Sequence, residues 1–215
     1  MPKLINGAGE LHQAVNVLKQ VNSSNIFIVT DKTLVSLGMV RNLTDYLDKA
    51  QLPFVVFDEI TPDPTIAMIE QGVSLYKQHR CDSFIVFGGG SVIDCGKAIA
   101  ASVVKDKNVQ ALSGLFKVRK KLPPFIAIPT TAGTGSEATL VAVVTDPRKK
   151  QKFTVIDPCL VPHHAILDPL LMVGLPAKIT AETGIDALTH AVESFIGLHG
   201  TAETKLYSLE AIQRI

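Results

Sequence analysis

The sequence predicts an α/β fold in which helices cover a parallel sheet, followed by the start of an all-helical segment. Short, uniformly apolar runs alternate with longer segments of helical periodicity, as expected for strands that helices bury on both faces. Clusters of Gly, Thr and Ser follow two of the apolar runs and mark tight turns. After residue 176 only helical periodicity remains.

The first part of the chain alternates strand and helix patterns. Apolar runs predict strands, at residues 25–31, 54–57, 83–87 and 125–128. Helical spacing between these runs predicts helices, over residues 35–49, 65–79 and 92–104. Shorter apolar runs predict two more strands, at residues 152–156 and 164–167. This order favours a parallel sheet, and ligands of such sheets bind beyond the carboxyl ends of the strands.

Residues 177–215 contain two helical patterns and no strand pattern. Thr180 or Thr183 is a candidate cap for the first helix, and Gly197 and Gly200 are expected to end it. The second helical pattern continues to the end of the chain without a stop signal.

The change of pattern near Pro176 predicts two units. A helical hairpin as short as the one after Pro176 would hardly bury its own apolar face. We therefore expect a complete α/β domain of the nucleotide-binding type over residues 1–175 and an incomplete helical domain over residues 176–215. Apolar positions on the last helix favour association with another surface, at Leu206, Leu209 and Ile212.

Composition excludes several classes of function. The charges are balanced, with 21 Lys and Arg against 20 Asp and Glu, so a nucleic-acid partner is not expected. No stretch approaches the roughly 20 apolar residues of a membrane helix, and the first residues lack a signal-peptide run. The three cysteines have no Cys-x-x-Cys spacing, which fits a reducing compartment. We expect a cytoplasmic protein with no membrane partner.

The glycine cluster at residues 88–91 lies between a predicted strand and a predicted helix. Glycines let the backbone approach a diphosphate, and the first N–H groups of a helix attract negative charge. The spacing is not the G-x-G-x-x-G fingerprint, because residue 93 is Ile93. A tight turn from strand to helix is the alternative interpretation.

Two further groups follow predicted strands. Residues 130–136, TTAGTGS, offer hydroxyls and backbone donors to a diphosphate or an amide, although Thr134 or Ser136 capping a helix is the alternative. Asp31 ends the first predicted strand, where a carboxylate can accept from ribose hydroxyls and repel a 2′-phosphate. This chemistry favours NAD over NADP, and a capping role for Asp31 is again the alternative.

Other charged and metal-binding residue types give weaker signals. Asp186 and His190 are four apart on a predicted helix, which suits either a shared divalent metal or a surface hydrogen bond. Two ligands are fewer than the three of a usual catalytic site, and the remaining histidines do not complete a set. Asp94 and Lys97 are interpreted as part of a solvated helix face. Lys152 begins a predicted strand near the crevice and is a candidate contact for phosphate or ribose.

Three motifs together resemble signatures of the iron-containing (group III) alcohol dehydrogenases. Residues 88–97, GGGSVIDCGK, resemble that family's GGGSxxDxxK signature. Residues 129–137, PTTAGTGSE, resemble its PTTAGTGSE loop, and residues 184–193, GIDALTHAVE, are similar to its metal-helix signature. The resemblance covers essentially the whole chain, but only about the first half of a typical family member.

The resemblance implies an NAD-dependent oxidoreductase with its active site between a dinucleotide-binding domain and a helical, metal-binding domain. Asp31 corresponds to the acidic residue that selects NAD in the family. Other cofactor-contacting positions of the family correspond to Asp63, where several members carry Asn, and to Gly89, Gly90, Ser91, Thr130, Thr131, Thr134 and Lys152. Asp186 and His190 correspond to two of the four ligands, one Asp and three His, that bind Fe2+ or, in some members, Zn2+.

The implied reaction interconverts a small primary alcohol and its aldehyde. The metal binds the alcohol oxygen, and a hydride passes to the nicotinamide; no side chain stands out as the general base. With two of four metal ligands present, we expect little or no turnover from this chain alone, and a homo-oligomer in the intact family member. Two alternatives stay open: a non-catalytic nucleotide-binding or oligomerising module, and a zinc-dependent relative such as a glycerol dehydrogenase.

Overall fold

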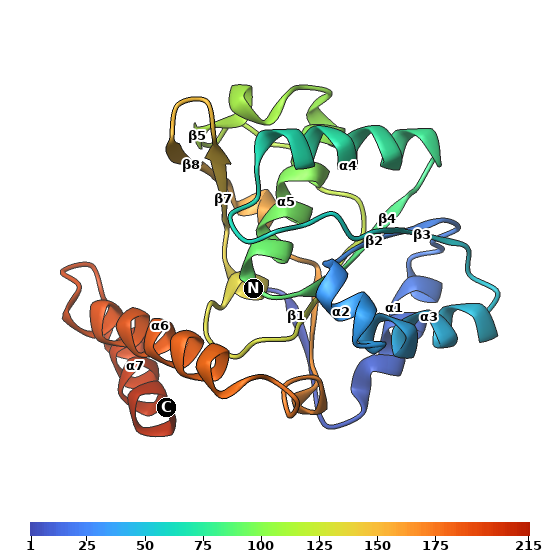
Figure 1. The fold of residues 1–215 in the computed structure, drawn as a ribbon. Coiled ribbons are helices and arrows are strands. Elements are labelled where there is room, and N and C mark those ends of the chain that lie inside the picture. Colours follow the sequence, from blue (N-terminus) through green and yellow to red (C-terminus); the bar gives the residue numbers. More distant parts are fainter.

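The computed structural model describes all 215 residues and contains a six-stranded sheet in which all neighbouring strands are parallel (Figure 1). The strand order is β1-β9-β6-β4-β2-β3. Five strands confirm the predicted ones within three residues at either end, namely β2 (Ile26–Val29), β3 (Phe54–Phe57), β4 (Ser83–Gly88), β6 (Phe125–Pro129) and β9 (His164–Leu167). The sixth, β1 (Lys3–Asn6), was not expected from the sequence.

The strand order reverses between β2 and β4. The chain passes from β2 outward to β3 and then returns to place β4 on the other side of β2, so that Val29 pairs with both Phe57 and Val86. Helices that leave such neighbouring strands diverge to opposite faces, and this opens a crevice at the carboxyl ends of the two strands. Asp31 follows β2 and Gly89 follows β4, so both residues flank this crevice.

Side chains of the central strands alternate between two cores. Phe27 and Val86 point to the face covered by α4 (Ile66–Gln78) and α5 (Gly90–Lys105). Ile28 and Phe87 point to the opposite face, where they share a core with side chains of α1 (Gln13–Gln20), α2 (Lys32–Ser36) and α3 (Met39–Lys49). The strands are fully buried on both faces, which explains their uniformly apolar sequences.

A second, three-stranded sheet packs beside α5 (Figure 1). It has the order β5-β8-β7 and consists of β5 (Gly114–Leu115), β7 (Val141–Asp146) and β8 (Gln151–Ile156). The strand predicted at residues 152–156 is therefore present but lies outside the main sheet. Strand β7 was not expected, although its alternating burial, with Ala142 and Val144 inside, is typical of a strand with one covered face.

Two predicted details of the helices are wrong. The helix expected over residues 35–49 is two helices, because Gly38 between them has a left-handed φ of +72° that ends one helix and starts the next. Thr180 and Thr183 do not cap a helix. The helix begins earlier, after Pro176, and the Thr180 and Thr183 hydroxyls donate instead to carbonyls one turn before them, on Pro176 and Ile179.

The last two helices, α6 (Ala177–Ile196) and α7 (Ala202–Arg214), form a hairpin that stands apart from the main sheet (Figure 1). Gly197 follows α6, as predicted. Several large apolar side chains of this hairpin are exposed, among them Ile196, Leu206 and Leu209. None of the helices combines the length and the apolar composition that a bilayer-spanning segment requires.

Candidate functional site

The start of α5 is built for close approach to its neighbours. A Cβ added to Gly88 would come within 2.7 Å of Val92, and one added to Gly90 would come within 2.8 Å of Thr134 Cγ2. Glycine at these two positions therefore lets the strand, the helix and the loop after β6 converge. The amides of Gly90 and Ser91 belong to the first turn of α5, where N–H groups have no earlier helical carbonyl to bind. The structure thus places Gly89, Gly90 and Ser91 at a helix N-terminus suited to an anion.

The loop after β6 lies alongside this helix start. The Thr131 side chain is 3.4 Å from the position of a Cβ on Gly89, and its buried hydroxyl has no hydrogen-bond partner. A buried hydroxyl without a partner is costly and calls for a ligand or an ordered water. Thr134 Oγ1 accepts a hydrogen bond from the Ser136 amide at 3.3 Å, and Thr130 is buried behind the loop. Thr130, Thr131 and Thr134 are therefore brought together with the glycine turn.

Asp31 lies at the far side of the crevice and has two roles available. Its Oδ1 accepts from the Leu34 amide at 2.9 Å, so the capping interpretation is confirmed. Its Oδ2 makes no hydrogen bond within the protein, and the side chain is only partly buried. That oxygen is free to accept from a ligand hydroxyl.

Asp63 and Lys152 meet although they are far apart in the sequence. The Thr145 amide donates to the Pro64 carbonyl at 2.8 Å, and Thr145 pairs with Lys152 across strands β7 and β8. This arrangement brings Lys152 Nζ to 2.6 Å from Asp63 Oδ1. Both side chains are more than half exposed, so the ion pair is solvated and weak. Asp63 also has a left-handed φ of +60°, which Asp and Asn tolerate better than most residues.

Asp94 and Lys97 are not a solvated helix face, and that prediction is wrong. Lys97 is completely buried, and its Nζ donates to the carbonyls of Ser136 at 2.6 Å, Thr139 at 2.8 Å and Val141 at 3.1 Å. Asp94 Oδ1 accepts from the Ser136 hydroxyl at 2.5 Å, and its Oδ2 accepts from the Val143 amide at 3.0 Å. Ser136 therefore does not cap a helix, as one interpretation held, but bonds to α5.

A signal for this burial was present in the sequence. Between Val92 and Val104 the only charged residues are Asp94 and Lys97, and small or apolar residues surround them. A helix that is apolar on all sides is buried. A charged pair one turn apart in such a helix must therefore find polar partners inside the protein.

Burial shifts the pKa values of the charged groups around this anchor. Loss of hydration lowers the pKa of Lys97 to about 8, against the opposing attraction of Asp94 and Glu137. Burial also raises the pKa of Asp94, although the Ser136 hydroxyl and the Val143 amide counteract it. Burial likewise raises the pKa of Glu137 in the same loop. At neutral pH Lys97 remains mostly protonated, so the anchor is an ammonium group among oxygen acceptors.

Asp186 and His190 lie on one face of α6, as predicted. Asp186 Oδ1 is 3.8 Å from His190 Nε2, and both side chains are about half exposed. One carboxylate oxygen and one imidazole nitrogen are suitable donors for iron or zinc. No group of three or more His, Cys, Asp or Glu side chains lies close enough to bind one ion. The chain therefore supplies a two-donor set, which is smaller than a stable catalytic metal site requires.

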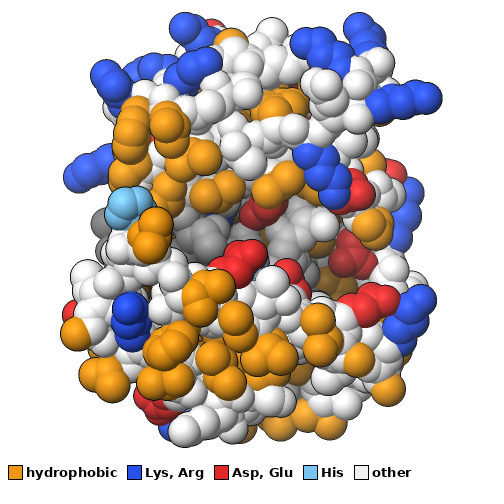
Figure 2. Space-filling view, turned by 90° about the vertical axis from the view of Figure 1, so that its left-hand side faces the viewer, with side chains coloured by type: hydrophobic (Ala, Val, Ile, Leu, Met, Phe, Trp, Pro, Cys, Tyr) orange, Lys and Arg blue, Asp and Glu red, His pale blue; other side chains and the backbone are white.

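Helix α6 touches the loop after β6 (residues 130–135, called the Thr-rich loop below) at Gly133. A Cβ on Gly133 would lie 2.1 Å from the Thr183 carbonyl oxygen, so only glycine permits this contact. Asp186 follows Thr183 by about one helical turn. The contact therefore links the loop beside the helix start to the helix that bears Asp186 and His190. Figure 2 shows a hollow across this side of the molecule, with acidic side chains along it and apolar side chains over the hairpin below.

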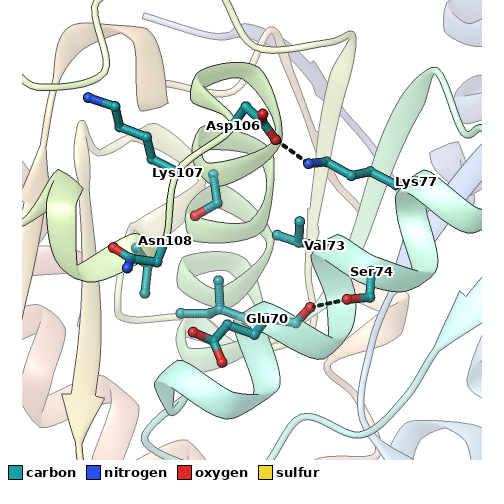
Figure 3. A pocket seen from close by; sticks show the side chains of 10 residues that line it. Glu70, Val73, Ser74, Lys77, Asp106, Lys107 and Asn108 are labelled. Carbon is teal, nitrogen blue, oxygen red and sulfur yellow. Dashed lines mark hydrogen bonds and ion pairs between the residues drawn. The ribbon is translucent and has the colours of Figure 1, made fainter.

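A different cavity lies between α4 and the C-terminal end of α5 (Figure 3). It has a volume of about 290 Å³ and is lined by Glu70, Lys77 and Asp106 among others, with Lys77 and Asp106 forming an ion pair. Because α5 has 16 residues, this end lies about 24 Å from the helix start. The cavity is therefore remote from the residues that the sequence singled out.

The chain is similar to known proteins in both sequence and fold. The profile of the family described as iron-containing alcohol dehydrogenase matches residues 2–169. The NAD-dependent methanol dehydrogenase of Bacillus methanolicus is 37% identical over 214 residues, which cover 100% of this chain and 56% of that protein. The solved structure of the alcohol dehydrogenase from Oenococcus oeni has a TM-score of 0.94 and 33% identity, covering 98% of this chain and 56% of that chain.

A third relative was solved with the dinucleotide. The sulfoacetaldehyde reductase from Bifidobacterium kashiwanohense in complex with NAD+ has a TM-score of 0.82 and 31% identity, covering 90% of this chain and 51% of that chain. The chain thus spans about half the length of the relatives that it matches. By the family profile and by both the sequence and the fold of these relatives, it belongs to the iron-containing alcohol dehydrogenase family.

Proposed function

We propose that the chain binds NAD as part of an oxidoreductase that interconverts a small alcohol and its aldehyde. The observation that supports this most is the juxtaposition of the Gly89–Gly90 helix start with the unpartnered Thr131 hydroxyl, beside the crevice between β2 and β4. Family membership adds the reaction class, because the similar proteins include an NAD-dependent methanol dehydrogenase and an aldehyde reductase solved with NAD+.

The proposed binding mode assigns a separate task to each side of the crevice. The amides of Gly90 and Ser91 and the Thr131 and Thr134 hydroxyls donate to the diphosphate, and Gly89 leaves room for its oxygens. The free Oδ2 of Asp31 accepts from the adenosine ribose and disfavours a 2′-phosphate.

Asp63 and Lys152 face each other on the neighbouring loop and strand. There Lys152 can contact the cofactor when it leaves Asp63, and Thr130 supports the loop from behind. When bound, the nicotinamide supplies the hydride acceptor or donor. In this proposal residues 1–175 are the dinucleotide-binding domain.

Asp186 and His190 are proposed as two ligands of a metal ion held by a helical domain that begins at residue 176. Their spacing on one face of α6, and the contact of Thr183 on the same helix with Gly133 in the proposed cofactor loop, support this assignment. Because two ligands do not complete a site, the dialysed chain is expected to retain far less than one equivalent of iron or zinc. Metal analysis after dialysis checks this, and retention of one equivalent would contradict it.

The test of the proposed function is a fluorescence titration of the chain with NADH and with NADPH, followed by an assay with short primary alcohols and aldehydes. Saturable binding of NADH, tighter than that of NADPH, is the expected result. Replacing Asp31 with Ser, which keeps a capping oxygen, is expected to reduce the preference for NADH. No saturable binding of either dinucleotide would refute the proposal.

A non-catalytic dinucleotide-binding module is the second candidate, and the two-donor set at Asp186 and His190 favours it. It predicts NADH binding without turnover and without retained metal. Turnover of an alcohol by the chain alone, at a rate proportional to its concentration, would exclude this candidate and support the complete enzyme.

A further inference from the structure

Asp94 and Lys97 form a buried charged pair on α5, and burying charge in an apolar helix is costly unless the charges have polar partners. Lys97 is completely buried, yet it lies between Gly96 and Ala98 in a run of small apolar residues. Its partners all come from the segment that follows the Thr-rich loop. Four oxygen atoms of that segment accept from Nζ within 3.1 Å, on Ser136, Thr139 and Val141.

The chemistry of these partners requires an ammonium group. Three of the four acceptors are backbone carbonyl oxygens, and an ammonium has three donors and no lone pair. A neutral amine would direct its lone pair towards an oxygen, and an apolar side chain would remove the Nζ donor from all four acceptors. The Lys97 side chain therefore holds together a short 3-10 turn at Ser136–Ala138, Thr139 and the start of strand β7 at Val141.

Asp94 completes the anchor one turn earlier on the same helix. Its two carboxylate oxygens accept from the Ser136 hydroxyl and the Val143 amide. Asp94 thus joins the start of the segment, at Ser136, to strand β7, while Lys97 binds the residues between them. Together the two side chains attach residues 136–143 to the helix whose first turn is the proposed diphosphate site.

The anchored segment is continuous with the proposed cofactor contacts. The Ser136 amide donates to Thr134 Oγ1, and Thr134 packs against Gly90 at the helix start. We infer that Lys97 and Asp94 are positioning residues for dinucleotide binding, which hold the Thr-rich loop so that Thr131 and Thr134 stay beside the first turn of α5. This inference rests on the proposed function, since it concerns the same cofactor site.

A purely structural role would lower stability without a specific effect on binding, so a matched control is needed. Gly96 precedes Lys97, and a Cβ on Gly96 would lie 2.5 Å from Val86 Cγ2. Gly96→Ala therefore disturbs the packing of α5 on β4 without removing any contact to residues 136–143. It serves as the control for loss of stability alone.

The experiment compares Lys97→Met, Asp94→Ala, Asp94→Asn and Gly96→Ala with the unmodified chain. The dissociation constant for NADH is measured at a temperature at which circular dichroism shows each variant to be folded. Lys97→Met and Asp94→Ala are expected to raise this constant by about tenfold or more, which corresponds to about 1.4 kcal/mol. Asp94→Asn keeps a donor and an acceptor for the same two partners and is expected to recover most of the affinity.

Amide hydrogen exchange gives a second, local readout. Lys97→Met and Asp94→Ala are expected to speed exchange in residues 131–139, whereas Gly96→Ala, at a similar loss of Tm, leaves NADH affinity within about twofold of the unmodified chain. If Lys97→Met does not fold, the Asp94→Ala and Asp94→Asn pair decides.

The inference is overturned if unmodified protein binds NADH and Asp94→Ala weakens binding no more than Gly96→Ala does. If unmodified protein does not bind NADH, the proposed function fails, and the inference fails with it.

Discussion

A substitution at Gly89 is expected to affect cofactor binding with little effect on folding. Its φ of −74° and ψ of −176° are open to any amino acid, and an added Cβ would meet nothing closer than the Thr131 side chain at 3.4 Å. Gly89→Ala is therefore expected to change the free energy of unfolding by less than about 1 kcal/mol, with the lower entropy of the unfolded chain partly offsetting a slightly poorer helix cap.

The same methyl group would occupy the space next to the first turn of α5, where the diphosphate is proposed to lie. Pushing the phosphate away from one amide removes a charge-assisted hydrogen bond of about 1.5–3 kcal/mol. The NADH dissociation constant should therefore rise by roughly tenfold to a hundredfold. Fluorescence titration measures this constant, and urea unfolding measures stability.

Gly96→Ala is the matched comparison, since its Cβ would come within 2.5 Å of Val86 Cγ2 in the core between α5 and the sheet. It is expected to lose about 1–3 kcal/mol of stability through overpacking and to keep its NADH affinity. Unchanged NADH affinity in Gly89→Ala, with the protein folded, would refute the placement of the diphosphate.

Three more predictions follow from the same geometry. Asp63→Asn removes the solvated ion pair with Lys152 and is expected to leave Tm nearly unchanged and NADH affinity unchanged or higher. Lys152→Ala is expected to weaken NADH binding in a salt-dependent way. Weaker NADH binding by Asp63→Asn would count against this role of Lys152. Gly133→Ala brings a Cβ to 2.1 Å from a carbonyl oxygen of α6 and is expected to lower Tm by thermal unfolding, whereas Gly184→Ala, with nothing within 4 Å, should raise or keep it; equal Tm values would contradict the contact. Burial alone would raise the pKa of Asp82, but hydrogen bonds from neighbouring hydroxyls and amides lower it. The Asp82 carboxylate therefore stabilises the fold above its unfolded pKa of about 3.9, and this stabilisation is lost as the pH falls through the lower folded pKa. Urea unfolding between pH 5 and pH 3 should show a smaller loss of stability for Asp82→Asn than for the unmodified chain, and an equal loss would contradict this.

The sheet could be predicted because its strands are buried on both faces. Residues such as those of β2 and β4 must all be apolar there, and a uniform run is easy to recognise. The positions of the glycine turn and of Asp31 followed, since residues after parallel strands meet at one edge of the sheet. Strand β1 could not be predicted in this way, because it is a short edge strand with mostly exposed side chains and has no uniform apolar run.

The internal anchor on α5 could not be placed by the same reasoning. A charged residue in a helix is usually solvated, and that expectation applied to Lys97 in isolation. What decides its burial is the segment at residues 136–143, because the Ser136, Thr139 and Val141 carbonyls reach Lys97 Nζ only through the tertiary structure. Likewise, Thr180 and Thr183 could not cap the helix at residues 177–196, because it begins after Pro176 and both residues lie inside it.

The most decisive measurement is a crystal structure of the chain grown with NADH. We expect the diphosphate within hydrogen-bond distance of the Gly90 and Ser91 amides, with the Thr131 hydroxyl donating to it and a ribose hydroxyl donating to Asp31. Dinucleotide bound elsewhere, for example in the cavity between α4 and the C-terminal end of α5, would contradict the proposed binding mode.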